Sequence, residues 1–516
     1  MNLRGEEPTI NPNAFSISRL LNSNHEKPGI ACIFLSKFDV KKGNIIIWSK
    51  SINDATFDLN NIEFKSLPAG IHEQTDDVVN FVVPKTFGAN DTAKETVYDY
   101  GIAYFKQNSF DIIENDNQVD RSKVQMFSLG VIIDVQDMSS DSKKQFYKEI
   151  YHAYSANRYV SHLKELLSQW INQENLDKFD IFDNFFKENN QGRIAENSVK
   201  VFEHSPQERR HLVEYLSYWT RKLGPLIFPL WRASLLQLRI LILVPQGESF
   251  ELCNSLAYCI FLISMLSKDL IGNHMSDDYI KPIFTVSTSD IPFLESFRKG
   301  SGYVATTGEE ILLYKPEIYD IVVKLTSRSI MEEFPGKDVE IITSSGEHNK
   351  ATPLDLETYE KFILGELKED ASTNFKSKLY GVTEPISWLQ FLIDGLYLLT
   401  TAGYLVAPYH LTKNFKISKH VSGPEPNDSE IQIAENIVRY FHFRTSKLYN
   451  MLKSVVQESE NTDSEQPITI SASLLTKLNL DCFSKQDHQF IKDITYRWFQ
   501  RKVEISNLPD CLRNLC

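Results

Sequence analysis

Apolar residues in the first third of the chain gather in short runs separated by polar turns, a pattern typical of β-strands. The runs at 30–38 (IACIFLSKF) and 43–49 (GNIIIWS) flank the polar turn 39–43 and predict a hairpin. Further runs predict strands at 78–83, 98–105 and 124–135. Between 145 and 170 the apolar positions change to helical spacing, so we expect residues 28–175 to form a small α/β sandwich.

Residues 205–326 alternate helical and strand-like segments. Helical patterns lie on both sides of a break at Gly224 and Pro225, and a strongly apolar helix is predicted over 250–266. The strand-like segments are 239–244, 283–287, 302–306 and 319–325. This alternation predicts an α/β domain whose sheet is covered by helices.

The last third of the chain has a mainly helical pattern. Helices are predicted at 353–367, 386–400, 431–455, 472–480 and 486–499. Ser484 and Asp487 have the spacing of a helix cap, and Phe490, Ile494 and Trp498 form an inner stripe. We therefore divide the chain into a disordered N-terminal tail (1–27), an upstream α/β module (28–175), a connector (176–204), a central α/β module (205–326), a linker (327–352) and a downstream helical module (353–516).

Charge and cysteine content narrow the classes of function. The 516 residues include 55 Lys and Arg against 68 Asp and Glu, a formal net charge of −13. Such a surface repels phosphate backbones, so nucleic acid is not an expected partner. The six cysteines form no CxxC pair, which favours a reducing compartment. Because the N-terminus lacks the apolar core of a signal peptide, we expect a cytoplasmic protein.

Residues 385–408 (PISWLQFLIDGLYLLTTAGYLVAP) are apolar and long enough to cross a membrane. Asp394 lies near the middle of this segment, where a carboxylate costs about 2.5–3.5 kcal/mol on insertion. No Lys or Arg closely flanks either end. We therefore predict that the segment forms a buried helix pair in a soluble domain.

The sequence contains no common catalytic motif. GxGxxG, Walker A, HExxH and GxSxG patterns are all missing, and the twelve histidines do not cluster. The segment 299–302 (KGSG) has the composition of a phosphate loop, but it precedes a strand instead of a helix, so we expect a surface turn. The sequence therefore predicts no catalytic residue, no cofactor and no metal site.

Several segments resemble the LCHN branch of the DENN-domain proteins, in particular a fungal-like member of that branch. They are 61–72 (NIEFKSLPAGIH), 224–248 (GPLIFPLWRASLLQLRILILVPQGE), 282–295 (PIFTVSTSDIPFLE) and 302–323 (GYVATTGEEILLYKPEIYDIVV). Their order and spacing fit across about residues 28–325. The resemblance implies an α/β plus α fold with three DENN-like parts: a longin-like α/β sandwich, a central α/β domain and a mainly helical C-terminal domain.

The resemblance also implies a function in membrane traffic. Many DENN proteins are guanine-nucleotide exchange factors for Rab-type small GTPases, so such a GTPase is the expected partner, docking between the upstream and central modules. Nucleotide exchange needs a shaped interface and no chemical step, which agrees with the lack of catalytic motifs in the sequence. Whether the protein is an enzyme is therefore left open. Lys65, in the 61–72 segment, is a candidate GTPase contact, and the alternative is a solvated lysine at a strand end.

Two other functions stay open. DENN folds also serve as non-catalytic scaffolds at membranes. A GTPase-activating role would need an exposed arginine that neutralises transition-state charge, and Arg298 is the arginine whose context suits that role. Cys511 and Cys516 near the C-terminus are candidates for S-acylation, which would give peripheral association with an internal membrane; ordinary reduced thiols are the alternative.

Overall fold

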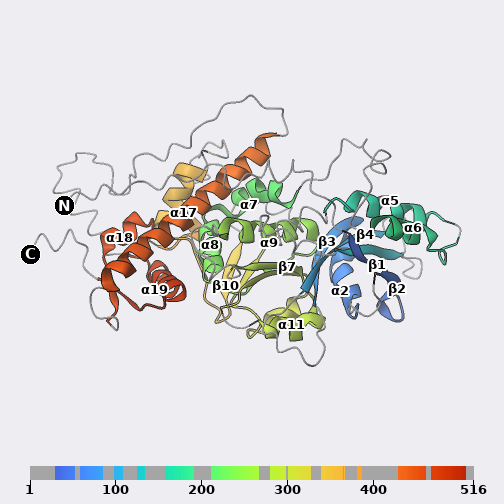
Figure 1. Ribbon diagram of the computed structural model, residues 1–516, viewed down its shortest axis with the longest axis horizontal. Coiled ribbons are helices and arrows are strands. Elements are labelled where there is room, and N and C mark those ends of the chain that lie inside the picture. The colour runs from blue at the N-terminus through green and yellow to red at the C-terminus, as the bar shows by residue number, and fades with distance from the viewer. Residues whose placement is uncertain are drawn as a thin grey trace, which may run out of the picture.

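The strands of this protein join into one large mixed sheet (Figure 1). The computed structural model describes residues 29–52, 59–84, 98–108, 125–133, 157–173, 175–190, 211–265, 279–297, 300–326, 339–363, 365, 380–385, 428–460 and 466–506. Within these residues the sheet has ten strands in the order β10-β9-β6-β8-β7-β3-β4-β5-β1-β2. An additional pair, β11 (Ile468–Ile470) and β12 (Val503–Ile505), is parallel.

The first part of the chain forms an antiparallel half of the sheet. Its strands are β1 (Ile30–Asp39), β2 (Gly43–Ser51), β3 (Asp76–Pro84), β4 (Tyr98–Gln107) and β5 (Met126–Ile133). Helices α5 (Val160–Ile171) and α6 (Asp180–Asn189) cover one face, where Trp170 and Phe182 are buried. The short helix α2 (Ile62–Ser66) lies on the opposite face, where Ile62 packs in a cluster with Phe34 and Phe81.

The second part of the chain forms a parallel half. Its strands are β6 (Ile240–Leu243), β7 (Lys281–Thr285), β8 (Tyr303–Thr307) and β9 (Ile321–Lys324), with β10 (Glu340–Thr343) antiparallel at the edge. The helical elements are η5 (Leu212–Tyr215), α7 (Leu216–Leu223), η6 (Gly224–Leu226), α8 (Ile227–Leu235), α9 (Phe250–Ser264), η7 (Thr288–Asp290), α11 (Ile291–Ser296) and η8 (Glu310–Tyr314). Helices α7, α8 and α9 lie on one side of this half, and α11 lies on the other (Figure 1).

Helix α9 connects the two halves. It contacts β3 of the antiparallel half as well as β7 and β8 of the parallel half. Its other side is covered by η5, α8 and the long C-terminal helix α17 (Asp428–Glu460). Because α9 lies between a sheet and a helical layer, it is apolar on nearly all sides, as its sequence FELCNSLAYCIFLIS indicates.

The C-terminal part shares its core with the parallel half. It contains α13 (Pro353–Thr358), the π-helical turn η9 (Tyr359–Ile363), η10 (Tyr380–Val382), α17, α18 (Ala472–Lys477) and α19 (Lys485–Phe499). Phe441 of α17 packs against Phe228 and Trp231 of α8, and Phe490 of α19 also meets Trp231. The predicted cap is confirmed, since the Asp487 N–H donates to Ser484 Oγ over 3.3 Å.

The α/β plus α fold class is confirmed by these elements, with corrections of detail. The linker 327–352 contains the edge strand β10, and the connector 176–204 contains helix α6. The segment 61–72 contains α2 and the 3₁₀ turn η1 (Ile71–Glu73), so Lys65 lies in a helix and not at a strand end. The four-residue strand β10 and the five-residue helix α2 were missed because neither is long enough to show a clear period.

Some predictions concern residues outside the described part of the chain. They are the disordered tail 1–27, most of the buried helix pair at 385–408, and the helix start before residue 157. Among the residues that are described, no helix combines the length and apolarity needed to cross a membrane.

Candidate functional site at the join of the sheet halves

The two halves of the sheet meet through very little backbone pairing. Strands β3 and β7 run parallel, and their backbones pair where Phe81 of β3 faces Thr285 of β7. Beyond that point the pairing ends, because the Ser287 N–H donates to Asp290 Oδ2 over 2.9 Å and the chain bends into η7. We call this region, with α2, η7 and the start of α9, the sheet join. Side chains must therefore hold the halves together there.

Lys65 lies inside the sheet join. Its residue exposure is 3%, and its Nζ donates to the Val82 carbonyl over 2.7 Å. The same Nζ lies 2.6 Å from Asp290 Oδ1 and 5.7 Å from the centre of the Phe293 ring. The expectation of a solvated lysine was therefore wrong, because the ammonium is buried in an ion pair. A direct contact between Lys65 and a GTPase stays a prediction.

Asp290 fixes the bend that receives this lysine. Its Oδ2 accepts the Ser287 N–H over 2.9 Å, which is one half of a capping box, and it also accepts the Ser287 hydroxyl over 3.2 Å. The ion pair thus connects the segment 61–72 with the segment 282–295, two of the segments on which the family resemblance rested. Sequence reasoning selected Lys65 but gave no sign of its partner, because 225 positions separate the two residues.

Asp77 of β3 anchors the start of α9. The Phe250 N–H donates to Asp77 Oδ2 over 2.6 Å, and the Ser249 hydroxyl donates to Oδ1 over 2.8 Å. A carboxylate at a helix N-terminus satisfies unpaired N–H groups and interacts favourably with the helix dipole. Burial nevertheless raises the pKa of Asp77 to about 6, because desolvation outweighs these hydrogen bonds.

This raised pKa predicts how stability depends on pH. The folded protein keeps a proton on Asp77 up to about pH 6, whereas the unfolded chain releases it near pH 3.8. Stability from this group is therefore complete below pH 3.8 and is lost as pH rises through about 6, by roughly 2–3 kcal/mol. Asp77→Asn, which cannot titrate, is expected to flatten the change of melting temperature between pH 4.5 and 7.

Asp76→Asn is the matched control for this measurement. Burial alone would raise the pKa of Asp76, but the Tyr104 hydroxyl and the Lys164 ammonium lower it overall. Asp76 therefore titrates below pH 4.5. Its replacement should leave the change of melting temperature between pH 4.5 and 7 as in the wild type. Equal slopes for the wild type and Asp77→Asn would contradict the prediction.

A polar cluster beneath the sheet joins the same strands from the side of α9. Asn254 Nδ2 donates to Thr285 Oγ1 of β7 over 3.0 Å, and the Thr306 hydroxyl of β8 donates to Asn254 Oδ1 over 2.5 Å. A longer bond of 3.4 Å leads from Asn254 Nδ2 to the Asn80 carbonyl of β3. In the sequence, an asparagine within a mainly apolar helix was the feature that could have indicated this cluster. The hydrogen bonds offset the cost of burying its amide.

Loops from both halves also touch at the carboxyl end of the parallel strands. Gly308, after β8, lies so close to the Ala69 carbonyl that an added Cβ would overlap it. Gln74 Nε2 donates to the Gly247 carbonyl over 2.6 Å, and Gln246 donates to Glu73. The carboxyl edge of parallel strands is the usual place for binding sites in α/β sheets.

Exposed apolar side chains flank this contact. Phe64 of α2 is 39% exposed, and Ile311 and Tyr314 of η8 are 62% and 83% exposed. Helix η8 begins two residues after Gly308, and the Thr288 N–H of η7 donates to Glu309 Oε2 over 2.9 Å. We call Phe64, Ile311 and Tyr314 the rim residues. Apolar side chains of this kind are typical anchors of protein interfaces.

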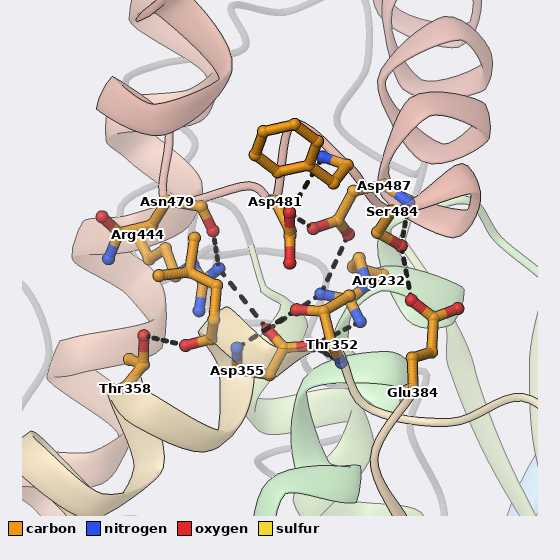
Figure 2. Close-up of polar contacts among 12 residues, drawn as sticks. Arg232, Thr352, Asp355, Thr358, Glu384, Arg444, Asn479, Asp481, Ser484 and Asp487 are labelled. Atoms are coloured by element: carbon orange, nitrogen blue, oxygen red, sulfur yellow. Dashed lines mark hydrogen bonds and ion pairs between the residues drawn. The ribbon is translucent and has the colours of Figure 1, made fainter. Parts of the chain in front are cut away.

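A second buried cluster lies away from the sheet join and holds the C-terminal part (Figure 2). Arg232 of α8 donates to both oxygens of Asp355, over 3.0 and 2.6 Å, and its Nη1 lies 3.3 Å from Asp487 Oδ1. Arg444 of α17 donates to the Asn479 carbonyl over 2.6 Å. Its guanidinium lies 4.8 Å from the centres of the Phe228 and Trp231 rings. Elements far apart in the sequence therefore share one charged core.

Burial raises the pKa of two carboxyl groups in this cluster. Desolvation raises the pKa of Asp487 to about 7, although the positive charge of Arg232 opposes the rise. Burial also raises the pKa of Glu384, which accepts a hydrogen bond of 2.8 Å from the Ser484 hydroxyl. With Arg232, Asp355 and Asp487 all buried, the cluster forms a structural core.

The remaining candidate residues are not placed by the structure. Arg298, Cys511 and Cys516 lie outside the described residues. Within the described ranges, no three His, Cys, Asp or Glu side chains gather as metal ligands. Cys32, Cys253 and Cys259 are buried free thiols.

Comparison with known proteins identifies the family. The chain is 81% identical over all 516 residues to "Uncharacterized protein ANR2" of Saccharomyces cerevisiae (strain ATCC 204508 / S288c), and the match covers 100% of both chains. It is 26% identical to DENN domain-containing protein 11 of Xenopus laevis over 310 residues, which are 58% of this chain and 60% of that protein. The counterpart from Danio rerio is 25% identical over 307 residues, 58% of this chain and 54% of that protein.

Family models match two regions of the chain. Residues 456–510 match a domain of unknown function, DUF4484, which begins within α17 and includes α18 and α19. Residues 33–335 match the model of DENN domain-containing protein 11, and this region contains both halves of the sheet up to β9. The chain therefore belongs to the family of DENN domain-containing protein 11.

Proposed function

We propose that this protein is a guanine-nucleotide exchange factor for a Rab-type small GTPase in membrane traffic. Its membership of a DENN-domain family supports an exchange role. The observation that carries the proposal is the set of rim residues, Phe64, Ile311 and Tyr314, exposed where both halves of the sheet contribute loops. The proposed layout keeps three modules, at 28–175, 205–326 and 353–516, acting as one unit.

Exchange of this kind is a coupling between two binding equilibria. A factor that binds the nucleotide-free GTPase more tightly than the loaded form weakens nucleotide binding by the same factor. It does so by holding the switch segments in a conformation that no longer supports Mg²⁺ and phosphate. No acid, base or nucleophile is required, so the protein needs only a rigid surface on which both halves of the sheet present contacts.

Two alternatives remain for the test to decide. A scaffold would bind its partner without accelerating nucleotide release. A GTPase-activating protein would accelerate hydrolysis through an arginine such as Arg298, whose position the structure does not describe. Peripheral membrane association through S-acylation of Cys511 and Cys516 also remains a proposal.

The proposal predicts faster release of a fluorescent GDP analogue from at least one member of a panel of purified Rab proteins. Tyr314→Ala is expected to raise the KM for the responding GTPase by about tenfold or more, because removing an aromatic anchor from an interface typically costs 2 kcal/mol or above. Initial release rates would be followed by fluorescence at a low, fixed concentration of the full-length protein, with the nucleotide-loaded GTPase varied in excess.

Tyr496→Ala supplies the matched control. Tyr496 is also an exposed tyrosine, 53% accessible, but it lies on α19 of the C-terminal part. Its replacement should leave the release rate unchanged. If the folded wild-type protein accelerates release from no Rab in the panel, the exchange proposal fails, and GTPase binding without acceleration would favour the scaffold.

A further inference from the structure

Lys65 occupies a place where the sheet lacks a hydrogen-bond donor. Along the sheet join, β7 bends away after Thr285, which faces Phe81 of β3. The next carbonyl of β3, that of Val82, receives the Lys65 ammonium over 2.7 Å. A buried carbonyl left without a donor would be costly, so this side chain substitutes for a missing strand N–H.

The positive charge of Lys65 is balanced by a residue from the other half of the sheet. A buried ammonium needs an opposite charge, and Asp290 Oδ1 provides it at 2.6 Å. Asp290 is held in turn by the Ser287 N–H and hydroxyl, and the Phe293 ring faces the ammonium at 5.7 Å. The side chains around the ammonium therefore come from η7, which follows β7, and from α11, whereas Lys65 itself belongs to α2.

We propose that Lys65 and Asp290 form a positioning pair that sets how the α2 side of the sheet join is held relative to the η7–η8 side. Phe64 is the neighbour of Lys65 in α2, and the bend of Asp290 is bonded to Glu309 just before η8. The pair thus lies between the elements that carry Phe64 and those that carry Ile311 and Tyr314. Its role in exchange, though not its role in the sheet, rests on the function proposed above.

The side-chain chemistry is specific for lysine. A compact ammonium can donate to Val82 and Asp290 at once, along different directions. The planar fork of arginine is larger and favours two parallel bonds to one carboxylate, so Lys65→Arg should not restore the geometry. Methionine keeps the length of the side chain but provides no donor. We therefore expect both Lys65→Met and Lys65→Arg to weaken the contact between the two halves at the sheet join.

The first test measures amide hydrogen exchange of the full chain without any GTPase. Lys65→Met is expected to increase exchange at least tenfold at residues 82 and 83 and at 285–290, while α17 and α19 keep wild-type protection. Lys50→Met is the control, because Lys50 forms an ion pair of 2.6 Å with Asp183 elsewhere on the first half, with both side chains about one third exposed. Equal exchange in both variants would overturn the positioning role.

Asp290→Asn keeps the inference testable if Lys65→Met folds poorly. It is nearly isosteric, leaves the ammonium without its counter-charge, and should by itself increase exchange at 285–290. Where both single variants fold, a double-mutant cycle tests the pairing. If the residues act as a pair, the double variant Lys65→Met with Asp290→Asn should protect 285–290 about as well as the worse single variant. Additive losses would show independent roles and overturn the pair.

Nucleotide release then separates positioning from direct contact. With a responding Rab, Lys65→Met is expected to lower kcat about tenfold at unchanged KM, because docking survives while contacts from the two halves no longer act together. A raised KM at unchanged kcat, the pattern expected of Tyr314→Ala, would mean that Lys65 meets the GTPase itself and would overturn the inference. If no Rab responds to the wild type, the proposed function fails, and the hydrogen-exchange result still decides the role of the pair.

Discussion

Arg232→Ala is expected to lower the free energy of unfolding by about 3–5 kcal/mol, because it leaves buried carboxylates without their counter-charge. Arg232 is 5% exposed and donates to both oxygens of Asp355 while facing Asp487 (Figure 2). Arg444 can compensate only in part, since its Nη2 lies 3.9 Å from Asp355 Oδ1, too far for a hydrogen bond. Chemical unfolding followed by circular dichroism would measure the loss.

The control for Arg232 is Lys361→Ala in η9. Lys361 forms an ion pair with Glu357 one helical turn away, and the two side chains are 44% and 29% exposed. Pairs of this type contribute about 0.3–0.5 kcal/mol, so this variant should unfold close to the wild type. A loss below 1 kcal/mol for Arg232→Ala would refute the assignment of Arg232 as the charged centre of this core.

The Arg232 cluster also bears on the domain of unknown function. Asp487 lies within the matched range 456–510, whereas Arg232 lies within 33–335. Trp231, the neighbour of Arg232, donates its indole N–H to Thr445 of α17 over 3.0 Å. The two matched regions therefore share a core, and Arg232→Ala should expose protease sites in α17 and α19 as well as in α8.

The sequence predicted local features well and long-range partners poorly. The strands of the parallel half and helices α17 and α19 follow from apolar periodicity, which is a property of neighbouring residues. The partner of Arg232 at position 355 and the partner of Lys65 at position 290 depend on the folded topology, so no local pattern contains them. The burial of Lys65 was missed for the same reason: lysine is rarely buried unless it is paired.

The continuity of the sheet was likewise hidden from the sequence. The pattern separated an upstream sandwich from a central α/β unit, but β3 and β7 join them into one sheet through the Phe81 and Thr285 pair. A single pair of facing residues leaves no trace in apolar periodicity. Asn254 was a signal of the contact, as a polar residue within an apolar helix, yet its partners could not be named. Asp77 gave no such signal, because it follows a run of polar residues.

Gly308→Ala is expected to force the sheet join apart and to abolish nucleotide exchange. An added Cβ would overlap the Ala69 carbonyl, which is backbone and cannot rotate away, and it would also lie 3.2 Å from the Phe250 ring. Overpacking of this kind typically costs about 1–3 kcal/mol, here at the contact between the segment 61–72 and the start of η8. Thermal unfolding and GDP release of the full-length variant would measure both effects.

Gly365→Ala tests whether the effect is specific to the close approach at Gly308. Among the described residues, no atom lies within 4 Å of the position of an added Cβ at Gly365, and the backbone there does not need glycine. Alanine should therefore leave the melting temperature unchanged or raise it slightly, with full exchange activity. If Gly308→Ala behaved in the same way, the loop of Ala69 would have to yield freely, and the sheet join could not be the rigid surface on which the proposed exchange mechanism depends.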